Sequence, residues 1–397
     1  MSQGFRRYHS LDALRASMML LGLVLHSAVN YAVAPLGEAW PYKDQSTSTL
    51  FDMAVFFIHL FRMPVFFVVA GFFAALLMAR EGAAGFLRNR VMRVLVPLAV
   101  CWPFVYPLIA AGFIYANTNA LGRVDMSPFT SGAFLATASL AHLWFLWDLM
   151  IFYAAAVLVA RLAARLSTQA VARIESGFAR IATSLGGALV MALITTLTLL
   201  PMEVAGLETS VSLLPPLRVL AAYAVFFTFG WLLYRRRDVI DDFARRWKVA
   251  MALGVLSTIG YLAITVGRVI PSPVGTHVAG CAVAGVAIWM LIIGIVGAFV
   301  SHLGQPRPIV RYASDASYWI YIVHLPLAIG IPGLMAAWTA PALVKFSITL
   351  LGTFTVTALS YHFLVRATAI GALLNGRRYP RALPAVERER APQVAAV

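Results

Sequence analysis

Ten long apolar runs, separated by short polar segments, limit the folds open to this chain more than any other feature. About 20 apolar residues are enough to cross the hydrocarbon core of a bilayer. Lipid offers no hydrogen-bond partner to an open backbone, so each run is expected to be helical even where glycine or β-branched residues are frequent. We therefore predict an all-α integral membrane protein, a single bundle of about ten transmembrane helices. The runs occupy residues 11–33, 51–79, 94–116, 141–160, 183–202, 217–234, 249–267, 277–300, 312–333 and 343–365.

The composition supports a membrane protein and argues against a nucleic-acid partner. Hydrophobic residues make up 61% of the 397 and charged residues only 12%, which is outside the range of soluble domains. The net charge of +15 could indicate nucleic-acid binding, but the basic residues lie in short clusters between apolar runs. The two cysteines, Cys101 and Cys281, fall in predicted spans and imply no disulfide framework.

The positions of lysine and arginine predict the orientation in the membrane. The N-terminal tail, every second loop and the C-terminal tail hold 24 of the 31 basic residues, so the positive-inside rule places both termini in the cytoplasm. The first span carries Asp12 and Arg15 and lacks a small-residue cleavage site, so no removable signal peptide is expected. Residues 1–366 are predicted to form one transmembrane domain, and 367–397 a basic, disordered cytoplasmic tail.

Ionisable side chains inside the predicted spans are the first candidates for function, because they are costly in a bilayer. Arg15 and His26 are eleven residues apart on the first span, which puts them on one helix face about 16 Å apart. His26, His59 and His324 lie at a similar depth, roughly 12 Å from the outer boundary of three spans. Asp148 is predicted at about 10 Å. Convergence at one depth favours a shared site over isolated interhelical contacts.

Two further sequence patterns add arginines to the candidate functional residues. Asp52, His59 and Arg62 follow i, i+7 and i+10 spacing and share one face of the second span. Arg90 and Arg93, three residues apart near the inner surface, could present a cationic fork to phosphates. The alternative is a plain positive-inside cluster. Together with Arg15 they would suit a polyanionic cytoplasmic ligand.

Several segments resemble the membrane-bound family 3 acyltransferases. The stretch YHSLDALRASMMLLGLVLHSAVNY has that family's pattern of an arginine, ten residues and a histidine. FFIHLFRMPVFFVVAGFF, FLRNRVMRVLVP, HLWFLW and ASYWIYIVHLPL follow in the family's order. Several of these segments look more narrowly like the branch that succinylates periplasmic glucans. Asp148 falls outside the pattern of HLWFL and ranks below the histidines.

The resemblance implies a multi-pass enzyme of the bacterial inner membrane that moves an acyl group from cytoplasmic acyl-CoA to a sugar hydroxyl outside. His26 would be the general base, since its unperturbed pKa lies near neutrality. His59 or Arg62 would stabilise the oxyanion, with Asp52 at the outer entrance. Arg15, Arg90 and Arg93 would hold coenzyme A.

The donor and acceptor follow less directly. A succinyl pocket needs a cation near the thioester, and Arg62 is the buried candidate for that carboxylate clamp; an acetyl pocket needs none. We expect succinyl-CoA or acetyl-CoA as donor substrate, with no metal and no tightly bound cofactor. Periplasmic glucan is the expected acceptor, and the glucan synthesis machinery is a further candidate partner.

Three alternatives use the same residues. The first is an O-acetyltransferase acting on another cell-surface polysaccharide. The second is a proton-coupled transporter, which would predict broken helices at matching positions in two halves, a pairing that the sequence lacks. The third is a haem or metal protein that uses His26, His59 and His324 as ligands.

Overall fold

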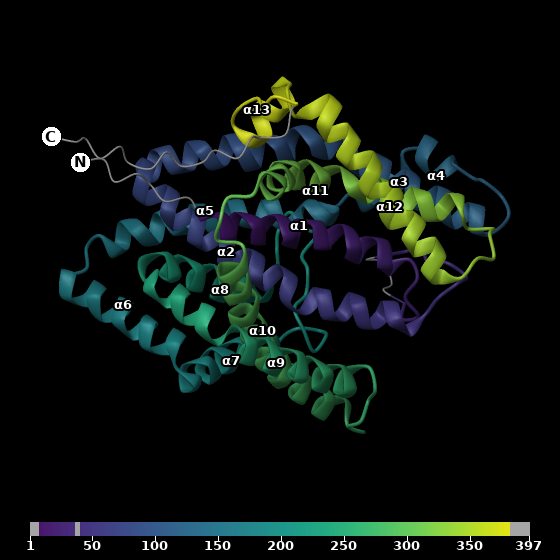
Figure 1. Ribbon diagram of the computed structural model, residues 1–397. Coiled ribbons are helices and arrows are strands. Elements are labelled where there is room, and N and C mark those ends of the chain that lie inside the picture. Colours follow the sequence, from purple (N-terminus) through teal and green to yellow (C-terminus); the bar gives the residue numbers. More distant parts are fainter. Residues whose placement is uncertain (1–7, 36–39, 382–397) are drawn as a thin grey trace.

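The structure is a computed structural model that describes residues 8–35 and 40–381, and all regular elements within these ranges are helical (Figure 1). The long helices are α1 (His9–Val29), α2 (Thr49–Arg90), α3 (Val96–Ala120), α5 (Trp144–Ala163), α6 (Thr168–Thr183), α7 (Leu185–Leu199), α8 (Leu217–Arg235), α9 (Asp238–Thr265), α10 (Pro273–His302), α11 (Pro308–Leu334) and α12 (Ala342–Ser360). The short elements are η2 (Val91–Leu95), α4 (Ser127–Thr130), η3 (Ala133–Thr137), η4 (Ala141–Leu143), η5 (Tyr361–Val365) and α13 (Ala369–Asn375). The predicted all-α membrane fold is therefore confirmed.

The helical runs are fewer than the ten predicted spans. Among the described residues, eight helical runs are long and apolar enough to cross a membrane, or nine if the bent pair α6 and α7 counts as one span. Two predicted spans, 51–79 and 94–116, fall in a single helical run, Thr49–Ala120. The predicted span 183–202 contains only the 15 residues of α7, which meets α6 at an angle of 98°.

The run Thr49–Ala120 has a sharp internal break. Its 72 residues would make a straight helix of about 108 Å, over three times the thickness of the hydrocarbon core. At Gly82 the backbone leaves the helical region, with φ 69°, a conformation that glycine adopts at low cost. Figure 1 shows α3 returning toward the end of the bundle from which α2 came. The run therefore contains two passes, as the sequence predicted for this region.

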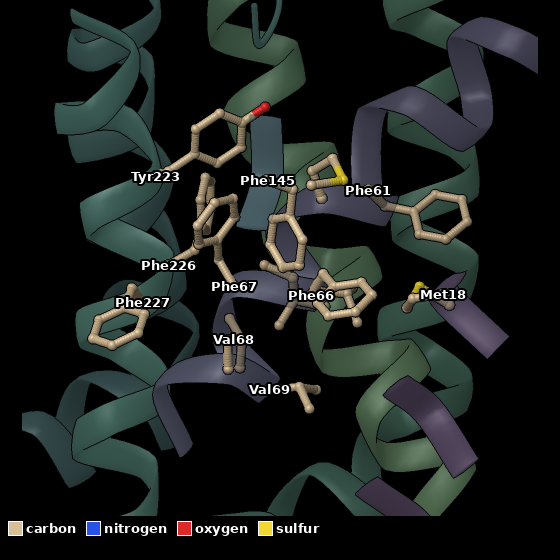
Figure 2. Close-up of a cluster of buried hydrophobic side chains, with 14 of the residues drawn as sticks. Met18, Phe61, Phe66, Phe67, Val68, Val69, Phe145, Tyr223, Phe226 and Phe227 are labelled. Atoms are coloured by element: carbon tan, nitrogen blue, oxygen red, sulfur yellow. The ribbon is translucent and has the colours of Figure 1, made fainter. Parts of the chain in front are cut away.

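The centre of the bundle is packed tightly where α2 crosses α8. A Cβ added to Gly71 would overlap the carbonyl oxygen of Phe227, and one added to Gly230 would overlap that of Val68. Small residues of this kind let two membrane helices approach closely. Figure 2 shows the aromatic core around this crossing, with Phe67 of α2 between Phe145 of α5 and Tyr223 of α8. This core fixes α2 and thereby the polar residues further along its length.

Both described ends of the chain lie at one end of the bundle. At the start of α1, Tyr8 accepts a hydrogen bond from Arg237 (3.2 Å) and the carbonyl of Asp12 accepts one from Ser314 (3.3 Å). After α12, Asn375 donates to the carbonyl of Asp315 (3.1 Å). We call this the arginine-rich end, and the opposite end, with segments 30–35, 40–48, 121–140 and 200–216, the cavity end.

The predicted tail from residue 367 is only partly irregular. Residues 369–375 form α13, because Leu374 is buried against the bundle and Asn375 is hydrogen-bonded to it. Residues 369–375 are thus helical, whereas residues 382–397 lie outside the described part of the chain, and the tail as a whole stays a prediction. The domain boundary at residue 366 stays a prediction.

Candidate active site

His26 and His324 meet near the cavity end. His26 lies in the last turn of α1, which ends at Val29 and not at residue 33 as predicted, because the following backbone turns toward α2. Nδ1 of His26 lies 2.8 Å from Nε2 of His324, and the two ring planes differ by only 5°. The rings are thus joined edge to edge by a hydrogen bond across α1 and α11.

Backbone carbonyls decide which nitrogen of this pair carries hydrogen. Nδ1 of His324 lies 2.8 Å from the carbonyl oxygen of Tyr321 and 3.1 Å from that of Ile320. A carbonyl only accepts, so Nδ1 of a neutral His324 is the donor and its Nε2 is the acceptor. Nδ1 of His26 must then donate to His324. The lone pair of the His26 ring is therefore on Nε2.

A cavity of about 870 Å³ opens beside His26, and His59, Arg62 and His142 also line it. Its walls are mainly apolar and aromatic, with a few polar groups. Pockets of this kind are typical of small-molecule sites, where few polar groups fix the orientation of the ligand. Aromatic side chains in the wall are Trp40, Phe56, Tyr106, Phe113, Phe134, Trp144 and Tyr261.

Arg62 brings to the cavity a positive charge that forms no ion pair with a carboxylate of the described residues. Its side chain is only 8% exposed, and its Nε has no hydrogen-bond partner among the described residues. A Cβ at Gly22 of α1 would overlap the Nη1 atom, so the absence of a side chain there leaves room for the guanidinium. A buried, unpaired charge is costly, which favours an anionic group of a ligand as its partner.

His59 and His142 are held by backbone carbonyls. Nε2 of His59 donates to Leu207 at 2.9 Å, and Nε2 of His142 lies 2.9 Å from the carbonyl of Tyr321 and 3.1 Å from that of Ile322. The carbonyl of Ile322 is available because Pro326, four residues later in α11, has no N–H. The ring of His142 is 5.1 Å from that of His324.

His142 was missed as a site residue, although the sequence placed it at the start of the helix that carries Asp148. The 3₁₀ turn η4 turns its ring inward, with a positive φ of 45° at Ala141. The carbonyl-freeing proline in HLPLAIGIP was the signal that could have linked this histidine to α11. The predicted depth of each residue in the membrane does not reveal this contact between two helices.

The two candidate carboxylates lie apart from the histidine pair. Asp52 accepts hydrogen bonds from the backbone N–H groups of Val33 and Ala34, at 2.9 and 2.8 Å, and so closes the segment after α1. Asp148 is fully buried, and neither carboxylate oxygen has a hydrogen-bond partner within the described ranges. It therefore does not orient a histidine by a direct hydrogen bond in this structure.

The three candidate donor-binding arginines lie toward the arginine-rich end. Arg15 is 3.6 Å from Asp12, with 38% of its side chain exposed, and Arg90 lies over the ring of Tyr153. The guanidinium of Arg93 packs against Gly376, where any side chain would overlap it. The C-terminal segment after α13 thus covers part of the predicted cationic fork.

Metal-ligand geometry is a separate question. No group of three histidine, cysteine or acidic side chains in the described parts of the chain is arranged to hold a metal ion. His26, His59 and His324 accordingly do not form such a ligand set here.

Comparisons with known proteins give one family. A model of the acyltransferase domain family matches residues 8–363. The chain is similar to glucans biosynthesis protein C of Escherichia coli (strain K12), with 32% identity over 149 residues, 37% of each chain. Proteins of that name from Salmonella paratyphi B and Salmonella heidelberg are 32% identical over 148 residues, 36% of this chain and 37% of theirs. The match thus spans about 37% of the length of these relatives. No solved structure matches the chain.

Proposed function

This chain belongs to the acyltransferase 3 family of membrane proteins, and from that membership we propose an O-acyltransferase with His26 as its general base. The observation that carries the proposal is the hydrogen bond between His26 and His324. It uses Nδ1 of His26 and so leaves the basic lone pair of the ring on Nε2, in a side chain that lines the cavity. In this proposal the arginine-rich end faces the cytoplasm of a bacterium, and the acceptor enters the cavity from the outer side of the inner membrane.

The reaction can be written with the chain's own residues. Nε2 of His26 takes the proton of a sugar hydroxyl as that oxygen attacks the thioester carbonyl of acyl-CoA. The new C–O bond forms, the C–S bond breaks, and the coenzyme thiolate leaves with the proton that His26 held. His324 keeps the ring of His26 oriented throughout, because it accepts the hydrogen bond from Nδ1–H.

For the acyl group we propose succinyl, and for the acceptor periplasmic glucan. The Arg62 guanidinium, which pairs with no carboxylate within residues 8–35 and 40–381, supports a donor with a second carboxylate, since Arg binds carboxylates by two parallel hydrogen bonds. The relatives named glucans biosynthesis protein C support a glucan acceptor. Arg15, Arg90 and Arg93 would bind the phosphates of the coenzyme.

The test is to offer succinyl-CoA or acetyl-CoA, with linear or cyclic β-glucan, to the purified protein in lipid nanodiscs. Mass spectrometry of the glucan is expected to show added succinyl groups with the wild-type protein. Acetylation alone would replace the succinyl proposal with the acetyltransferase alternative. No acyl transfer with any combination would contradict the proposed function.

The variant Arg62→Gln distinguishes the two candidate roles of Arg62, binding of the succinyl carboxylate and stabilisation of the oxyanion. If Arg62 binds the succinyl carboxylate, succinyl transfer falls while transfer of acetyl, tested as a poor second donor, changes little. Loss of one oxyanion donor would instead lower both rates by about 10²–10³-fold. An unchanged ratio of the two rates would contradict the carboxylate clamp.

A further inference from the structure

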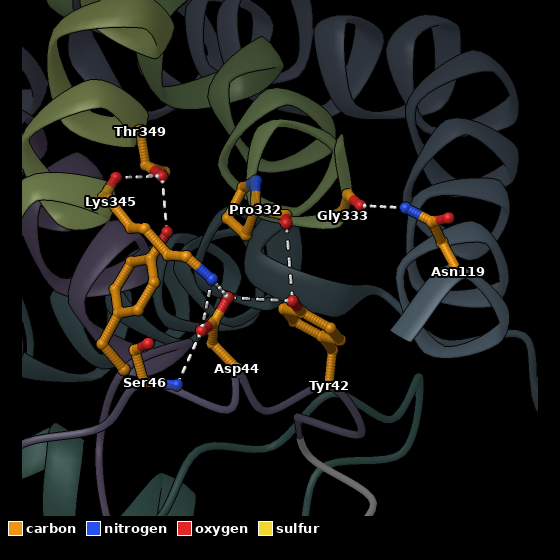
Figure 3. A network of polar contacts seen from close by, with 9 residues as sticks. Tyr42, Asp44, Ser46, Asn119, Pro332, Gly333, Lys345 and Thr349 are labelled. Atoms are coloured by element: carbon orange, nitrogen blue, oxygen red, sulfur yellow. Dashed lines mark hydrogen bonds and ion pairs between the residues drawn. The ribbon is translucent and has the colours of Figure 1, made fainter. Parts of the chain in front are cut away.

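A buried ion pair fixes residues 40–48, which precede α2, at the cavity end. Nζ of Lys345 on α12 lies 2.9 and 3.0 Å from the two carboxylate oxygens of Asp44, and neither side chain is exposed. Figure 3 shows this pair among the contacts of Tyr42, Ser46 and Thr349. Removing two charges from solvent is costly, so such a pair is weak evidence for a purely stabilising role. The position of the pair, close to Trp40 at the cavity end, suggests that it instead holds a residue of the site in place.

Backbone contacts make residues 40–48 a compact cover. The N–H of Asp44 donates to the carbonyl of Asn30 at 2.9 Å, and that of Ser48 donates to Tyr31 at 2.9 Å. The hydroxyl of Tyr42 donates to Asp44 (3.2 Å) and lies 3.4 Å from the carbonyl oxygen of Pro332. Burial and the adjacent Asp44 carboxylate raise the pKa of Tyr42, which keeps it a donor.

Asn30 connects this cover to Trp40. Its side-chain oxygen accepts from Nε1 of Trp40 at 3.0 Å, and its Nδ2 donates to the carbonyl of Ala328 at 3.0 Å. The carbonyl of Ala328 is available because Pro332, four residues later in α11, has no N–H. The position of the indole is therefore defined from both its own segment and α11.

The indole of Trp40 lies over His26. The ring centroids are 5.7 Å apart and the planes differ by 22°, so the two rings are stacked with a lateral offset. Phe113 meets Trp40 edge-on at 5.2 Å. An aromatic face within about 6 Å of a cation attracts it, most strongly where water is excluded. His26 becomes such a cation when it takes the acceptor's proton.

No carboxylate of the described residues hydrogen-bonds to His26 or His324. The familiar arrangement, in which an aspartate stabilises the imidazolium, is therefore not the one found here. The charge on His26 instead meets the lone pair of His324 at one edge and the indole of Trp40 on one face.

We propose that Trp40 is a positioning residue whose indole, held by the Asp44–Lys345 pair, stabilises the imidazolium form of His26 during acyl transfer. This inference rests on the proposed function. It differs from a role for Trp40 as a platform that stacks on the acceptor sugar, because a platform acts on acceptor binding and the imidazolium contact acts on the chemical step.

The experiment is steady-state transfer by the full-length protein with Trp40→Leu, and with singly to triply fluorinated tryptophan placed at position 40. Fluorine weakens the attraction of the ring for a cation while nearly preserving its shape. We expect kcat to fall roughly tenfold in Trp40→Leu and stepwise along the fluorinated series, with the acceptor KM within about twofold of wild type. Trp147→Phe is the control, since Nε1 of Trp147 also donates one hydrogen bond, in this case to the backbone carbonyl of Leu213, and no contact joins Trp147 to His26 among the described residues.

The buried pair is tested with Lys345→Met and with the double variant Lys345→Met/Trp40→Leu. The single variant should lower kcat, and the double variant should be no slower than Trp40→Leu, because both changes remove one contact. The fluorinated series needs no change of packing, so it remains informative if Lys345→Met fails to fold. A flat kcat along the series, or a loss confined to acceptor KM, would overturn the proposal. Absence of transfer by the wild-type protein would overturn the proposed function instead.

Discussion

The cavity end of the bundle contains one ion pair that is fully buried, whereas the ion pairs of α9 at the arginine-rich end lie near the surface. Asp44 and Lys345 are fully buried and paired at 2.9 Å. At the other end, Arg245 and Asp242 lie 3.0 Å apart with 69% of the arginine side chain exposed. Buried pairs depend on one geometry, while exposed pairs tolerate change. The difference suits a site for chemistry at one end and a binding surface for a mobile polyanion at the other.

The largest effect that tests this contrast is expected for Lys345→Ala. Asp44 would be left as an unpaired buried carboxylate, and the free energy of unfolding should fall by about 3–5 kcal/mol. Reversible unfolding in detergent micelles measures it. The control is the double variant Lys345→Met/Asp44→Leu, which removes both charges and should recover most of the loss. A double variant as unstable as Lys345→Ala would show that the loss does not come from an unpaired buried charge, and would contradict the contrast between buried and exposed pairs.

An intermediate effect is expected for Arg90→Ala combined with Arg93→Ala. Each arginine would lose a charge-assisted contact to a phosphate, worth about 1.5–3 kcal/mol, so the Kd for acyl-CoA should rise at least tenfold. Isothermal titration with a non-hydrolysable acyl-CoA analogue measures this affinity. Unfolding should change little, and an unchanged Kd would mean that these arginines serve only membrane orientation.

The smallest effect is expected for Arg245→Ala at the surface. Asp242 keeps a second contact, with Arg246, and exposed pairs contribute little to stability. The unfolding midpoint and the transfer rate should both match the wild type within error. A clear loss of stability would show that the arginine-rich end also depends on defined pairs.

The sequence predicted the helices and the approach of two histidines because both follow from simple regularities. Apolar length gave the spans, and arginine clusters gave a common reference from which His26 and His324 could be placed at one depth. The structure brings these two residues into contact. The break at Gly82 and the 98° bend between α6 and the short α7 were not predicted, because local backbone conformation decides them.

Contacts made by the loops could not be predicted in the same way. Asp44 and Lys345 are separated by 301 positions and neither lies in a periodic pattern that points at the other. Asp52 turned out to bind the backbone after α1 because the chain reverses there, which spacing along α2 does not reveal. Trp40 and His142 reach the site through carbonyls freed by prolines of α11, a signal visible in the sequence only once the partner helix is known.

The most direct test of the account is single-turnover transfer from bound succinyl-CoA by His26→Ala beside the wild type, with His277→Ala, a half-buried histidine at the cavity end, as the control. Loss of the general base should slow transfer by about 10²–10⁴-fold while the Kd for succinyl-CoA stays unchanged. Transfer by His26→Ala at a rate close to that of the wild type would contradict the central claim that His26 is the base.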